Sequence, residues 1–189
     1  NLLVGDARAL LHRQPKVYDA IVCQPSEPWL PWSAPLFTPE FYELMDKRLA
    51  PGGVAVQWIQ LYRIPEREFL AVLAAFGEVF PEIHLYRATS ADEVVVVGMK
   101  SGGLAPWESQ NWQLSGLEVV KKRLNWQRFG APRPLLGDKK IRQWVAEAGG
   151  PQKSLLGSQL EASLVLAGET GLDHASELIK KIYDLTKEE

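Results

Sequence analysis

One short loop carries the side chains best suited to chemistry, Gln24 and Glu27, which stand three residues apart in the run QPSEP. Prolines stiffen this loop, and Trp29 and Trp32 follow closely. A carboxylate in a tryptophan-lined pocket can bind an amine or transfer a proton. The alternative is a surface loop that the two tryptophans pack down. Because binding residues gather on loops held by a rigid scaffold, the sequence favours a site.

Two more polar residues stand where strands are expected to end. Asp6 follows the apolar residues 2–4, and its carboxylate can accept a hydrogen bond from an exocyclic amine such as that of adenine. It can equally cap the helix that follows, and taken alone the residue favours the cap. Gln57 opens a third strand end, at 57–62. Since ligands of doubly wound sheets bind outside the carboxyl ends of the strands, residues 5–8, 24–28 and 57–62 are expected to face one crevice.

The elements that must position these residues follow an alternating pattern. Apolar runs predict strands over 2–4, 17–23, 54–59, 82–88 and 93–99, and helices are expected to begin near residues 7, 39 and 65. The run 17–23 is apolar enough for a strand buried on both faces. The order β-α-β-α-β-α-β-β predicts a parallel sheet with right-handed crossovers and an antiparallel strand near one edge. The proline-rich stretch 24–35 is expected to be a loop without helix or strand.

A second region begins after Ser101-Gly102-Gly103, where the pattern turns helical. The predicted division is a domain at 1–100 and a helical C-terminal region at 104–189. Helices are expected over 117–126, 138–148, 158–167 and 172–186. We interpret this region as a small helical packing domain, with a partner-binding surface as the alternative.

Composition excludes several classes of protein. The net charge of −2 gives no field that would draw the chain to nucleic acid or to an anionic membrane. The single cysteine, Cys23, excludes a disulfide within the chain and fits a reducing compartment, so a cytoplasmic location is expected. No apolar run approaches the roughly 20 residues that span a bilayer. One cysteine and scattered histidines cannot complete a zinc set, so no metal site is expected. The absence of an initiating Met suggests a fragment or a processed chain.

The run GDAR…VYDAIVCQPSEPW…LFTPEFYELMDKRLAPGGVAVQWIQ resembles the spermidine/spermine synthase family, the polyamine aminopropyltransferases. It is most similar to divergent, often membrane-fused spermidine synthase-like proteins, and the resemblance covers about residues 1–99. The family implies an α/β fold: a partial doubly wound, Rossmann-like sheet of the S-adenosylmethionine-dependent methyltransferase type, here from its third strand onward. The helical C-terminal region does not share the resemblance.

The resemblance also implies roles for individual residues. Gln24 matches the aspartate that helps to deprotonate the attacking amine, Glu27 matches the second acid of that loop, and Pro28 matches its proline. Asp6 matches the acid that binds the adenine of decarboxylated S-adenosylmethionine. This compound, or S-adenosylmethionine itself, is expected as a co-substrate and not as a tightly bound cofactor. The implied sets are therefore Gln24 and Glu27 for catalysis, Asp6, Ala7 and Gln24 for the S-adenosyl ligand, and Glu27, Pro28 and Gln57 for the polyamine.

Two departures from the family leave the function open. Gln24 is an amide and accepts no proton at neutral pH. The glycine-rich loop of the family's first strand and the acid that ends its second strand are not in this sequence. Three functions are compatible with these facts. They are a transferase domain that needs its missing N-terminal half on a longer chain, a non-catalytic assembly domain, and a methyltransferase-like protein for another small molecule. Without neighbours on one side, the expected strand at 2–4 would close against 17–23, pair with another chain as in a homodimer, or fray.

Overall fold

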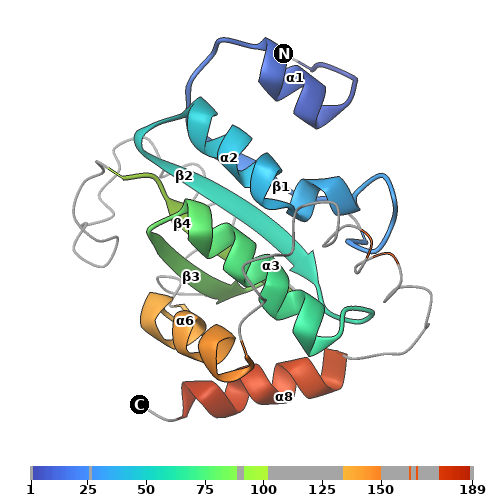
Figure 1. Ribbon diagram of the computed structural model, residues 1–189, viewed down its shortest axis with the longest axis vertical. Helices are drawn as coiled ribbons and strands as arrows, with labels where there is room; N and C mark the ends of the chain where they lie inside the picture. The colour runs from blue at the N-terminus through green and yellow to red at the C-terminus, as the bar shows by residue number, and fades with distance from the viewer. Residues whose placement is uncertain are drawn as a thin grey trace, which may run out of the picture.

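The computed structural model describes residues 2–25, 27–88, 92–101, 134–149 and 175–187, together with residues 162 and 165. A four-stranded sheet forms its centre (Figure 1). The strands are β1 (Tyr18–Cys23), β2 (Leu49–Gln60), β3 (Glu82–Arg87) and β4 (Glu93–Met99), in the order β1-β2-β4-β3. β1 and β2 are parallel, whereas β4 runs antiparallel to both of its neighbours. The predicted Rossmann-like α/β fold is confirmed, with its antiparallel strand one place in from an edge.

Two helices, α2 (Pro39–Arg48) and α3 (Glu66–Val79), lie side by side against one face of the sheet (Figure 1). Alternate residues of β2 are buried, among them Ala55, Gln57 and Ile59, because successive side chains point to opposite faces. The residues between them are only half-buried. The core therefore lies between this face and the two helices.

β1 is an edge strand, and this changes its burial. The apolar run 17–23 predicted burial on both faces, but Asp19, Ala20 and Val22 are exposed. That prediction is wrong because α2 and α3 cover one face of the sheet. In addition, the described residues give β1 a strand neighbour on one side only, which is β2.

No strand forms over residues 2–4, so that prediction is also wrong. Leu2 and Val4 are 90% and 92% exposed. A strand needs a partner for its N–H and C=O groups, and within the described part of the chain this segment has none. The helix that follows, α1 (Ala7–Arg13), forms as expected. The Arg48 side chain at the end of α2 donates to the carbonyls of Leu11 and His12, both at 2.8 Å, and so fixes the end of α1.

Two local features differ from the expected pattern. The proline-rich stretch holds a short 3-10 helix, η1 (Ala34–Phe37), whose Ala34 and Phe37 are buried in the core. β2 begins at Leu49 and not at residue 54, and its register with β1 shifts between Tyr18 and Ala20. Gly52 supplies the positive φ of 74° that this irregular start requires.

Two helices of the C-terminal region are described, α6 (Asp138–Glu147) and α8 (Ala175–Thr186), close to the predicted 138–148 and 172–186. Buried residues of both, including Trp144 and Leu178, join the same hydrophobic cluster as α3. The predicted helix 117–126 lies outside the described residues, as does 158–167 apart from its helical residues 162 and 165. The boundary near residue 102 and the domain division stay predictions.

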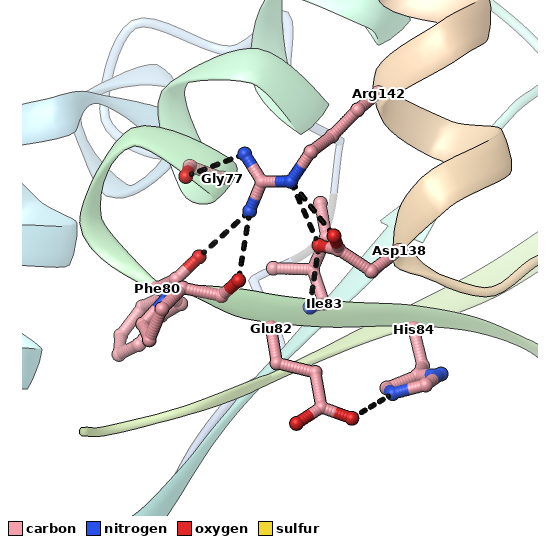
Figure 2. A network of polar contacts seen from close by, with 8 residues as sticks. Gly77, Phe80, Glu82, Ile83, His84, Asp138 and Arg142 are labelled. Carbon is pink, nitrogen blue, oxygen red and sulfur yellow. Dashed lines mark hydrogen bonds and ion pairs between the residues drawn. The ribbon is translucent and has the colours of Figure 1, made fainter.

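Polar contacts fix α6 to the end of α3 and the start of β3 (Figure 2). The Arg142 guanidinium donates to the carbonyls of Gly77, Phe80 and Pro81 at 3.1–3.3 Å. The Asp138 carboxylate accepts from the Ile83 N–H at 3.1 Å and pairs with Arg142 at 2.9 Å.

Among the helices of the described residues, none has the length and the apolar character that a membrane span requires.

Candidate functional site

The loop after β1 meets the end of β2 at Glu27. The Glu27 N–H donates to Gln60 Oε1 at 2.9 Å, and the Tyr62 hydroxyl donates to Glu27 Oε1 at 3.2 Å. The same hydroxyl lies 3.4 Å from Gln60 Oε1. Two of the three expected strand ends, 24–28 and 57–62, are therefore brought together.

The backbone of Glu27 has a positive φ of 54°, which is uncommon for a residue with a side chain. Such a conformation persists where surrounding contacts fix it. The Glu27 carbonyl accepts hydrogen bonds from the Ser33 hydroxyl and from the Leu30 N–H, while its N–H is held by Gln60. Both peptide groups of Glu27 are thus fixed, and the direction of its side chain with them.

Aromatic rings form one wall beside this carboxylate. Trp29 is buried, and its ring contacts that of Tyr62 edge to face, with centroids 4.8 Å apart. Partial burial, followed by the neighbouring Glu27 carboxylate, raises the pKa of the Tyr62 hydroxyl. Trp32 is 73% exposed, so only one of the two tryptophans packs the loop down. A carboxylate beside an aromatic wall has the chemistry to hold an ammonium group.

Gln24 and Pro28 occupy the two ends of the predicted loop. Gln24 directly follows β1 and is exposed, whereas Pro28 is buried beside Trp29. An exposed amide offers hydrogen bonds to a ligand but no proton acceptor at neutral pH.

Gln57 lies beneath the loop and not within it. It pairs in register with Cys23, it is fully buried on the helix-covered face, and its amide donates to the Trp58 carbonyl at 3.1 Å. Gln57 Oε1 and the hydroxyl of Tyr42 are buried, with no hydrogen-bond partner among the described residues. Burial raises the pKa of the Cys23 thiol to about 12, and a hydrogen bond with Gln57 opposes this shift in part. A polar cluster of Cys23, Tyr42 and Gln57 thus underlies the loop.

Asp6 and Ala7 lie at the start of α1. Asp6 Oδ1 accepts the Ala9 N–H at 2.8 Å, which is the capping use that the residue alone favours. Among the described residues, no hydrogen bond or ion pair joins Asp6 to the Glu27 loop. The strand expected to position Asp6 does not form.

No group of three His, Cys, Asp or Glu side chains in the described part of the chain is placed to hold a metal ion.

Three side chains that hydrogen-bond to Glu27 were not predicted as part of the site, those of Ser33, Gln60 and Tyr62. Gln60 and Tyr62 lie within the strand end 57–62 that is expected to face the crevice, but the family resemblance implies a role only for Gln57 there. The alternation of side chains along β2 is the sequence signal that distinguishes Gln57 from Gln60. Gln57 falls on the buried face and Gln60 on the half-exposed face.

Comparisons with known proteins give a family match and a similar protein. Residues 1–91 match the family model described as the spermine/spermidine synthase domain. Polyamine aminopropyltransferase 2 of Pseudomonas aeruginosa is 38% identical over 90 residues, which cover 47% of this chain and 26% of that protein. The match therefore spans about a quarter of the relative's length.

Proposed function

We propose that residues 1–91, which match the spermine/spermidine synthase domain model, form the amine-binding side of an aminopropyl transfer site. The supporting observation is the fixed position of Glu27. Gln60 accepts from its N–H, and the hydroxyl of Tyr62, whose ring packs on that of Trp29, donates to its carboxylate. A primary or secondary ammonium of a polyamine carries the charge and the N–H donors that this arrangement would bind.

The proposed reaction needs a neutral amine. The amine nitrogen gives up one proton and attacks the carbon next to the sulfonium of decarboxylated S-adenosylmethionine. A new C–N bond forms as the C–S bond breaks, the sulfonium becomes a neutral thioether, and the positive charge passes to the product nitrogen, which remains an ammonium. Glu27 is the proposed proton acceptor, because Gln24 cannot take that role.

On the donor side, the proposal gives Asp6 and Ala7 the adenine end of the S-adenosyl ligand, with Gln24 between donor and amine. Asp6 would serve this role in addition to its cap on α1. No residue of this sequence is assigned to the donor's methionine-like chain or to its ribose.

A product assay tests the proposal. The 189-residue chain is incubated with decarboxylated S-adenosylmethionine and putrescine or spermidine, and the aminopropylated product is measured. Glu27→Gln keeps the shape of the side chain but removes the proton acceptor, so product formation should fall by roughly 10²-fold or more. Glu43→Gln is the matched control, since Glu43 is exposed on α2 and pairs with Lys47. An unchanged rate in Glu27→Gln would remove Glu27 from the reaction.

The amide of Gln24 favours a second candidate, a non-catalytic domain that retains the fold. In that case the wild-type chain forms no aminopropylated product and shows no calorimetric binding of S-adenosyl ligands. Gln24→Asp separates the two candidates further. A carboxylate restored at this exposed position should raise the rate of a working transferase, whereas a non-catalytic domain would stay inactive.

A further inference from the structure

We infer that Gln60 is a positioning residue for Glu27. It accepts from the backbone N–H of Glu27 and lies beside the Tyr62 hydroxyl that contacts the Glu27 carboxylate. One atom, Gln60 Oε1, lies 2.9 Å from the Glu27 nitrogen and 3.4 Å from the Tyr62 hydroxyl. An amide oxygen has two lone pairs and can accept both hydrogen bonds. The consequence for amine binding rests on the proposed function, whereas the positioning itself does not.

Gln60 is well anchored for this task. It is the last residue of β2 and pairs in register with Glu93 of β4. The next residue, Leu61, is buried and donates its N–H to the Asp92 carbonyl at 2.9 Å. The acceptor atom therefore projects from the end of a central strand, across to a loop 33 residues earlier in the chain.

The backbone of Glu27 depends on such an anchor. Its positive φ of 54° is unfavourable for a residue with a Cβ atom, and no glycine stands at this position to relieve it. Ser33 and Leu30 donate to the Glu27 carbonyl, whereas Gln60 accepts from the Glu27 N–H. Loss of that acceptor should let the loop relax towards a negative φ and turn the carboxylate away.

Tyr62 extends the role of Gln60 to ligand exchange. The Tyr62 hydroxyl donates to Glu27 Oε1, which is the position that an ammonium N–H would take. When an ammonium binds there, the hydroxyl can turn to Gln60 Oε1 and keep a partner. Gln60 therefore lowers the free-energy cost of amine binding to the Glu27 carboxylate. The part-buried Tyr62 hydroxyl that the amine displaces still has a hydrogen-bond acceptor.

The test uses the 189-residue chain and two readouts: hydrogen exchange of the Glu27 amide by NMR, and the Kd for spermidine by calorimetry. Gln60→Met keeps the side-chain length but removes the strong acceptor. We expect Glu27 amide exchange to rise about tenfold or more and spermidine affinity to fall about tenfold. Gln60→Glu retains acceptor oxygens and should restore slow exchange of the Glu27 amide. Gln143→Met, on the exposed face of α6, is the matched control and should leave both unchanged.

The outcomes separate this inference from the proposed function. Unchanged Glu27 exchange in Gln60→Met overturns the positioning role. Faster exchange in that variant, with no spermidine binding by the wild-type chain, supports the positioning role and overturns the amine site. If Gln60→Met does not fold, Tyr62→Phe decides. This variant should keep the Glu27 amide protected because Gln60 still accepts from it, and lost protection would contradict the inference.

Discussion

At the scale of residues, the polar cluster beneath the site loop is costly to bury. The Tyr42 hydroxyl and Gln57 Oε1 lie in the core without a hydrogen-bond partner among the described residues, and the Tyr42 ring packs edge to face on Phe76. A buried polar group without a partner costs about 1–3 kcal/mol. Burial is also the main reason that the pKa of the Tyr42 hydroxyl lies well above its usual value. The base of the loop is therefore less stable than an apolar core of the same shape would be.

Cys23 offers a direct test of this burial. Its pKa rises from 9.0 to about 12, so the native thiol stays protonated at pH 8.5 while the thiol of an unfolded chain is partly ionised. Alkylation by iodoacetamide at that pH should be roughly 10²–10³-fold slower in the native protein than in urea.

The raised pKa of Cys23 also predicts that the stability of the folded protein falls as pH rises from about 9 to 12, because only the unfolded chain loses this proton.

The alkylation rate reports on a single thiol, because Cys23 is the only cysteine in the sequence. Mass spectrometry of the alkylated chain gives the rate, with free glutathione as the control for reagent activity. Equal rates in the native and the urea-unfolded chain would show that the thiol is not buried as described.

At the scale of elements, β4 depends on a glycine for its contact with α3. A Cβ atom at Gly98 would lie 2.5 Å from Phe76 Cε1 and 2.7 Å from Phe80 Cγ, closer than packed carbon atoms approach. Gly98→Ala should therefore destabilise the protein by about 1–3 kcal/mol through overpacking. Urea unfolding followed by far-ultraviolet circular dichroism measures this loss.

Gly5→Ala is the matched control for that substitution. A Cβ atom at Gly5 comes no closer than 3.5 Å to Leu10, which is ordinary contact, so this variant should unfold at nearly the wild-type urea concentration. If Gly98→Ala is as stable as Gly5→Ala, then α3 does not pack on β4 as closely as the structure indicates.

Most elements could be predicted from local pattern, and those that failed depend on distant contacts. The apolar runs and the proline at the start of α2 mark real strands and a real helix. Thr38 precedes that proline, at a position where threonine often caps a helix, but its hydroxyl donates to the Pro35 carbonyl and does not cap α2. Residues 2–4 have the composition of a strand but no neighbour to pair with, and the burial of η1 comes from packing that sequence periodicity does not report.

At the scale of the whole molecule, the sheet brings the site together. Prolines and tryptophans mark the loop of Glu27 and Pro28 in the sequence, while the roles of the two residues stay predictions. Gln60 and Tyr62 could not be assigned to Glu27 in the same way, since 33 and 35 residues separate them along the chain. Only the parallel pairing of β1 with β2 makes these two strand ends neighbours.

A calorimetric titration with spermidine shows whether the Glu27 loop binds an amine. The wild-type chain should bind, Glu27→Gln should bind roughly 10- to 100-fold more weakly through loss of one charge-assisted contact, and Glu43→Gln should match the wild type. Added salt should weaken binding only modestly, because the net charge of −2 gives little long-range attraction. Equal affinities in the wild type and Glu27→Gln, or no binding by the wild-type chain, would contradict the account.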